Sequence, residues 1–141
     1  MQVRLFTDKV LKISEEDVLG VYNLSRSHKK INLNDCTNES IERLRKELHL
    51  PDFVTTDNVE TKTFQHAMGK LKNEEAWLKA AVLYLISSLL CPQSRPEISL
   101  KYAHILEETT QISKYNWCEH ILTHLGKGLE KKQSKQPISC W

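Results

Sequence analysis

The stretch WLKAAVLYLISSLLCP, residues 77–92, decides the fold, because it contains the longest apolar segment of the chain. Apolar residues cover nearly the whole circumference of the predicted helix, which is typical of a helix at the centre of a domain. Asn73 is the predicted N-cap, and Pro92 ends the helix. Leu83, Tyr84 and Leu90 cover much of the circumference, and one apolar face is formed by Leu78, Ala81, Val82, Leu85, Ile86 and Leu89, so we expect a central helix with these residues inside.

The chain before this helix predicts a β-hairpin and three further helices. Apolar residues flank Thr7-Asp8-Lys9 within residues 3–13, which predicts a short hairpin. Ser14 is the predicted N-cap of a helix over residues 15–22, and Asp17 stands where a capping box needs an acid. Two more helices are predicted, one that begins near Asn38 or Ser40 and is ended by Pro51, and one that begins within residues 57–60. The predicted inward residues of these three helices are Val18, Leu19, Tyr22, Ile41, Leu44, Leu48, Phe64, Ala67, Met68 and Leu71.

After the apolar helix, residues 94–99 are predicted to form a turn and residues 100–108 a short helix. Ser113 is predicted to begin the last helix. The expected buried residues of these two helices are Tyr102, Ala103, Ile105, Leu106, Trp117, Ile121, Leu122 and Leu125. The predicted fold is therefore mainly α, a bundle of about five or six helices with a small N-terminal β-hairpin. We expect a single helical domain over residues 1–126, followed by a basic polar tail, residues 127–141, with an apolar tip.

Composition limits the class of protein. The chain has 141 residues and a net charge of +2, which suits one domain and indicates no particular partner. Its apolar segment is shorter than the 20 or so residues that span a bilayer, so no membrane span is expected. Four cysteines without a CxxC motif or a secretory signal predict reduced thiols inside the cell. We expect the cytoplasm or nucleus; a mitochondrial location would require a non-classical signal, because acidic residues come early.

No catalytic, metal or cofactor motif stands out. His120 and His124 lie four residues apart near Cys118 and Glu119, and His104 could add a ligand, but the HExxH order of zinc enzymes is missing. An amphipathic helix with two histidines at its polar edge is the favoured interpretation. No local signature supports a cysteine nucleophile. We therefore expect a protein that is not an enzyme and that binds no cofactor.

Two basic segments, residues 26–30 and 127–135, raise the question of nucleic-acid binding. Aromatic residues do not alternate with the basic ones, as they often do in such interfaces. A solvated surface is the favoured interpretation, and contact with phosphates stays an alternative.

Four pieces of the chain carry a resemblance to a known family. They are ISEEDVLGV (residues 13–21), the helix over residues 79–92, ISLKY (98–102) with ISKYNWC (112–118), and ISCW (138–141). In this order they resemble the plant mobile domain, a plant-specific family of transposon-derived proteins that is sometimes found beside Ulp-type protease domains. The shared motifs are packing motifs and carry no catalytic residue. The family has a glycine where this chain has Ser139, and it continues into another apolar helix where this sequence stops.

The resemblance implies a C-terminally truncated domain that acts by binding protein. A missing helix would leave an apolar groove open, unless the polar tail folds back over it, and an open groove favours a protein partner or self-association. The role could be sequestration of that partner, as a selfish toxin or antidote factor; the alternative is a nuclear nucleic-acid or chromatin-associated module. The candidate partner-binding residues, which also fit interior positions, are Leu83, Tyr84, Leu90, Trp117, Ile138 and Trp141.

Overall fold

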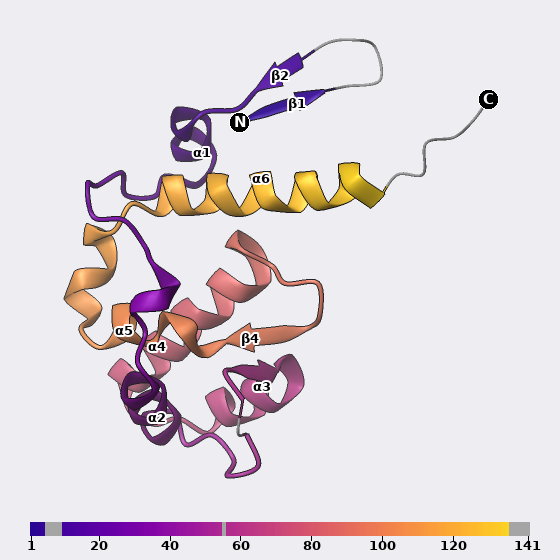
Figure 1. The fold of residues 1–141 in the computed structure, drawn as a ribbon. Helices are drawn as coiled ribbons and strands as arrows, with labels where there is room; N and C mark the ends of the chain where they lie inside the picture. Colours follow the sequence, from indigo (N-terminus) through magenta and orange to yellow (C-terminus); the bar gives the residue numbers. More distant parts are fainter. Residues whose placement is uncertain (5–9, 55, 136–141) are drawn as a thin grey trace. The chain divides into compact units, whose positions relative to one another are not determined.

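The computed structural model describes residues 1–4, 10–54 and 56–135. This part of the chain is mainly α, with a small antiparallel hairpin near its start, which confirms the predicted fold class (Figure 1). The chain divides into two compact units. Unit 1 comprises residues 1–31 and 113–141, and unit 2 is the continuous stretch 32–112.

Unit 1 begins with the predicted hairpin and helix. Strands β1 (Gln2–Arg4) and β2 (Val10–Lys12) pair in antiparallel register, and the predicted turn at Thr7-Asp8-Lys9 lies outside the described residues. Helix α1 (Glu15–Tyr22) has the bounds that the sequence predicts. The backbone amide of Asp17 donates to Ser14 Oγ, and the Asp17 carboxylate accepts the Ser14 backbone amide, so the capping box is confirmed.

Helix α6 (Trp117–Lys135) contacts α1 and completes unit 1. The prediction that this helix begins at Ser113 is wrong, because Ser113 lies in the 3-10 segment η4 (Thr109–Lys114). The N-capping hydrogen bond comes from Asn116, whose Oδ1 accepts the backbone amide of Glu119. A capping side chain must reach the amide two or three residues later, and Asn116 does so where the helix begins. The helix continues through Gly126 and Gly128, so the predicted boundary after residue 126 falls inside α6.

Unit 2 contains a strand pair that sequence reasoning missed. Strand β3 (Asn58–Glu60) pairs with β4 (Glu97–Ser99) in antiparallel register, with Val59 opposite Ile98. Residues 57–60 therefore do not begin a helix, and residues 94–99 are not wholly a turn. Each strand has only three residues and becomes regular by pairing with a segment far away in sequence, which a local pattern cannot indicate.

The helices of unit 2 are α2 (Asn38–Glu47), α3 (Thr61–Gly69), α4 (Glu74–Leu85) and α5 (Ala103–Leu106), with 3-10 turns η1 (Leu33–Asp35) and η3 (Leu100–Tyr102). Of these helices, α3 and α4 contact the strand pair, and α2 packs against α5. A single π turn, η2 (Ile86–Leu90), extends α4. Asn73 Oδ1 accepts the Ala76 amide, which confirms the predicted cap of α4. The large, fully buried side chains of this unit are Leu48, Val59, Phe64, Leu83, Ile86, Ile98, Leu100, Ile105 and Leu106.

Only one face of α4 packs inward, whereas the sequence predicts a central helix. Of the six residues expected inside, only Ile86 is buried; Ala81 and Val82 are half-buried, and Leu78, Leu85 and Leu89 are exposed. The buried residues of α4 and η2 are Ala76, Lys79, Ala80, Leu83, Ile86 and Ser87. The small side chains of Ala76 and Ala80 suit close packing, and the charge of Lys79 is met inside by Glu47. A helix that is apolar nearly all round gives no local reason to prefer one face.

Candidate interaction surface

The outer face of α4 and η2 carries a row of large apolar side chains, here called the outer stripe: Trp77, Leu78, Leu85 and Leu89. Their exposed fractions are 47%, 45%, 52% and 57%. Single exposed apolar residues are ordinary, but several on one helix face form a continuous patch. The outer stripe is the most extended apolar feature that we find on one element of the described residues.

Helical spacing explains why these side chains share a face. Trp77, Leu85 and Leu89 follow one another at multiples of four residues, and half-buried Ala81 fills the remaining position of the same row. Leu78 and half-buried Val82 form the neighbouring row. The stripe therefore has bulky side chains at both ends and smaller ones, Ala81 and Val82, between them.

Charged residues lie near both ends of α4. Exposed Glu74 and Glu75 lie in the first turn of the helix. Beyond its C-terminal end, Arg95 and Glu97 line a hollow together with Ser87, so a base and an acid lie there together. The first turn is thus acidic, whereas the charges near the other end have both signs.

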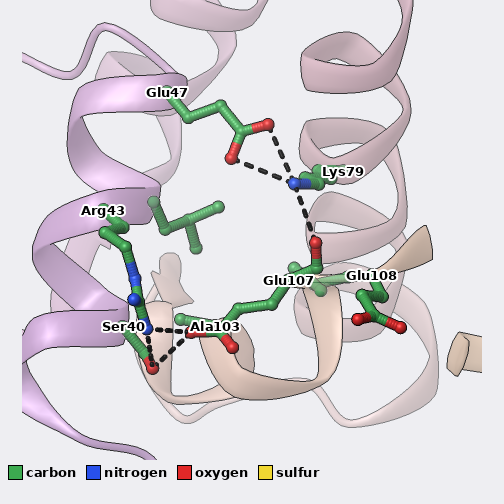
Figure 2. Close-up of a pocket in the computed structure, with 9 residues that line it drawn as sticks. Ser40, Arg43, Glu47, Lys79, Ala103, Glu107 and Glu108 are labelled. Carbon is green, nitrogen blue, oxygen red and sulfur yellow. Dashed lines mark hydrogen bonds and ion pairs between the residues drawn. The ribbon is translucent and has the colours of Figure 1, made fainter.

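The inner side of α4 borders a polar hollow of about 330 Å³, between α2, α4 and α5 (Figure 2). The ammonium group of Lys79, only 5% exposed, donates to both carboxylate oxygens of Glu47, at 2.9 and 3.0 Å, and to the carbonyl oxygen of Glu107 at 3.4 Å. These three acceptors match the three donors of an ammonium group. Lys79 therefore links α4 to α2 and to the end of α5.

A second cluster closes the other side of the same hollow. Arg43 Nη2 and Ser40 Oγ both donate to Glu107 Oε1, at 2.6 Å each (Figure 2). The hydrogen bond from Ser40, with Arg43 adding to it, holds the pKa of the Glu107 carboxyl below its ordinary value. Both basic side chains of the hollow are engaged by carboxylates, so the arrangement serves to join elements of unit 2 and offers no unpaired cation to an anionic ligand.

Glu107 makes the stability of unit 2 depend on pH in the acidic range. Because its pKa is lower in the folded state than its ordinary value of 4.5, its contribution to stability is complete above pH 4.5 and is lost as the pH falls through the folded pKa. We expect Glu107→Gln to be less stable than wild type at pH 7 and to lose less of its remaining stability between pH 5 and pH 3. Urea titrations across this range measure the slope. Glu108→Gln, a change at the exposed neighbouring residue, is the matched control, and equal slopes for all three proteins would contradict the assignment.

The predicted partner-binding residues fall into three groups. Leu83 is 0% exposed and Trp117 is 4% exposed, so neither side chain is available to a partner in this conformation. Tyr84 and Leu90 are half-buried, and the Tyr84 hydroxyl accepts a hydrogen bond from Gln65 Nε2 at 2.8 Å. Ile138 and Trp141 lie outside the described residues. Sequence reasoning did not find the outer stripe, because it placed Leu78, Leu85 and Leu89 inside.

The histidine and cysteine side chains of the described residues are not arranged for metal binding or nucleophilic catalysis. Among the described residues, no group of three or more His, Cys, Asp or Glu side chains is placed to hold a metal ion. Burial lowers the pKa of His120 to about 4, with further effects of His124 and Lys127, so its imidazole is neutral at pH 7. Burial raises the pKa of Cys36, Cys91 (to about 11) and Cys118. These thiols stay protonated at pH 7, whereas a nucleophilic cysteine reacts as the thiolate.

The basic loop at residues 26–30 is largely neutralised within unit 1. Arg26 contacts Glu15 at 3.2 Å and Glu16 at 3.5 Å, and Lys30 contacts Glu119 at 3.3 Å. The Lys29 ammonium lies 4.5 Å from the centre of the Tyr115 ring. Such exposed pairs add little stability, but they reduce the positive potential that a phosphate-binding loop needs.

Comparisons with known proteins identify a family whose function is unknown. No curated protein and no solved structure matches the chain. None of the helices in the described ranges is both long and apolar enough to cross a membrane. The one family description found does not mention the plant mobile domain, so that resemblance stays a prediction. Residues 1–140 match the model described as Domain of unknown function (DUF8566), and the chain therefore belongs to that family.

Proposed function

We propose that this protein is a non-enzymatic interaction module that binds another protein chain through the outer stripe of α4. The observation that carries the proposal is the row of four large apolar side chains, each about half exposed, on one face of a helix whose other face is fixed in a core. An apolar helix face that a fold leaves open is a common docking site for a protein.

The expected gain from docking is moderate. Full burial of a large apolar side chain is worth about 1.5–3 kcal/mol, so covering the exposed half of each stripe residue contributes about 1 kcal/mol. Four such residues together contribute about 4 kcal/mol to binding when a flat partner surface covers them. Trp77 is a tryptophan, a residue type that is enriched among those contributing most of the binding energy in protein interfaces. The stripe thus suits reversible binding whose specificity depends on the partner's shape.

The transposon-derived origin and the toxin or antidote role come from the resemblance alone and remain part of the proposal. Sequestration of a partner would require only a surface of this kind. We also propose a location inside the cell, because Cys36, Cys91 and Cys118 are free thiols. For the alternative of nucleic-acid or chromatin association, the pairing of Arg26 and Lys30 with carboxylates is unfavourable evidence.

The proposal is tested by capture from cell extract, with and without nuclease treatment, using three baits, namely wild type, Leu85→Glu and Val21→Glu. Val21 is 75% exposed on α1, so Val21→Glu places the same charge on an exposed apolar site of unit 1. We expect a protein bound to wild type and to Val21→Glu that is lost with Leu85→Glu. Equal recovery of every bound protein by all three baits would reject the stripe as the binding surface, and recovery that nuclease abolishes would favour the nucleic-acid alternative.

A further inference from the structure

We infer that unit 2 has a second binding site, which takes an extended acidic peptide with one aromatic side chain between two carboxylates. The site is a hollow of about 390 Å³ between helix α3 and the loop that follows α2, here called the basic hollow. Ligand sites in proteins usually begin at about 300 Å³, so the hollow has room for one large side chain. Its residues are not those of the outer stripe, and the inference does not depend on what that stripe binds.

The basic hollow has an apolar floor. Its apolar residues are Pro51 and Phe53 of the loop and Ala67 of α3. Ala67 is buried, whereas Phe53 is 75% exposed. The ring of Phe53 is therefore accessible, and a second aromatic ring that enters the hollow can pack against it. Aromatic pairs of this kind are worth more than the area that they bury.

The end of α2 fixes the loop. The backbone amide of His49 donates to the carbonyl oxygen of Lys46 at 3.2 Å. The amide of Leu50 donates to the carbonyl oxygen of Arg45 at 3.0 Å. These two bonds form a Schellman motif, with His49 at the left-handed position (φ 51°). Glycine is the usual residue there, so the chain keeps an imidazole beside the hollow at a conformational cost. Pro51 restricts the backbone further, so the site is formed before a ligand binds.

The rim of the hollow is basic. Its basic residues are His49, Lys62, His66 and Lys70. None of the described residues that line the hollow is acidic, and these four side chains form no ion pair within the described ranges. The acids nearest in sequence, Asp52 and Glu60, do not line it; Asp52 lines a separate hollow that contains Arg45. Charge complementarity therefore selects an acidic ligand.

The spacing of the rim matches an extended chain. Lys62, His66 and Lys70 follow one another at intervals of four residues along α3 and its C-cap. Four residues of a helix rise about 6 Å, so the two lysines are about 12 Å apart along the axis. Alternate residues of an extended peptide face the same side and lie about 6.6 Å apart. An acid, an aromatic residue and an acid at alternate positions thus place two carboxylates at the lysines and the ring over the floor between them.

A peptide fits this hollow better than a single-stranded nucleic acid does. Nucleic acids also carry regularly spaced anions, but proteins that bind them supply several aromatic rings for successive bases. Phe53 is the one Phe, Tyr or Trp among the described residues that line the hollow. The hollow therefore has a place for one ring and charges on both sides of it.

Titration of the isotope-labelled full chain with the peptide acetyl-ESWSE-amide, followed by the amide chemical shifts, tests the site. We expect saturable shifts concentrated at residues 49–53 and 62–70, with a dissociation constant on the order of 1 mM. The neutral peptide acetyl-QSWSQ-amide should bind roughly fivefold more weakly, because it lacks both carboxylates. No saturable shift with ESWSE, or equal binding of the two peptides, overturns the inference.

Two variants and a matched control locate the contacts. Lys62→Glu should bind ESWSE roughly fivefold more weakly, because one attractive contact becomes repulsive. It should stay folded, since an acid in the first turn of α3 suits the helix dipole. Phe53→Ala should weaken binding by roughly three- to tenfold through the lost ring contact. Lys72→Glu makes the same charge change at an exposed lysine that does not line the hollow, and it should bind as wild type does.

The same titrations show which outcome rejects the peptide site. Equal losses in Lys62→Glu and Lys72→Glu would reduce the effect to overall charge and overturn the inference. Shifts spread over the outer stripe, with none at residues 49–53 and 62–70, would do so as well. A short single-stranded oligonucleotide that shifts the same amides at lower concentration than ESWSE would assign the hollow to nucleic acid instead.

Discussion

Leu83→Ala is expected to lower the free energy of unfolding by about 3 kcal/mol, whereas Leu85→Ala, two residues later, should lower it by less than about 1 kcal/mol. Leu83 is 0% exposed, so its truncation removes a fully buried side chain and leaves a cavity. Leu85 is 52% exposed, and the space it vacates is open to water. Urea unfolding followed by circular dichroism measures both values.

This pair of substitutions also decides which face of α4 is the inner one. The sequence pattern predicted Leu85 inside, and the structure places Leu83 there. A larger loss for Leu85→Ala than for Leu83→Ala would restore the predicted orientation and remove the outer stripe. Both variants keep helix propensity nearly unchanged, because alanine and leucine are both strong helix formers.

Glu47→Ala is expected to cost about 3 kcal/mol of unfolding free energy, because it leaves the buried ammonium group of Lys79 without its carboxylate. The value lies at the low end for broken buried pairs, since the hollow beside Lys79 is large enough to admit water. Lys79→Met should cost about 1 kcal/mol or less. The Glu47 side chain that it leaves unpaired is 36% exposed and can be hydrated, and methionine refills the apolar part of the lysine site.

The double variant Glu47→Ala, Lys79→Met supplies the control. Because it removes both charges, it should recover most of the stability lost in Glu47→Ala alone. Denaturant titrations of the four proteins at pH 7 complete the cycle. Losses that simply add would show that the 2.9 Å contact between Lys79 and Glu47 contributes no coupling energy in solution.

Features set by neighbouring residues could be predicted from the sequence. The capping box of Ser14 and Asp17 and the cap at Asn73 are local, because each side chain bonds an amide three residues away. The inward positions of Leu44 and Leu48 are also confirmed, because charged residues fill the rest of α2 and leave only one apolar face.

Features set by distant residues could not be predicted. Lys79 is buried beside Glu47, which lies 32 residues earlier and accepts its hydrogen bonds, and no local pattern indicates such a partner. The pairing of β3 with β4 depends in the same way on two segments that are far apart in the chain. The sequence therefore could not indicate which side of α4 is exposed.

The discontinuous composition of unit 1 has a consequence for synthesis on the ribosome. Residues 1–31 emerge first, yet α1 contacts α6, which is made only after the whole of residues 32–112. At ordinary elongation rates this interval is on the order of 10 s. During that time the buried side of α1, centred on Val18, has no α6 to cover it, while unit 2 is still being made. This side of α1 is therefore uncovered in every round of translation until α6 is made, and stalling before residue 117 would prolong that exposure.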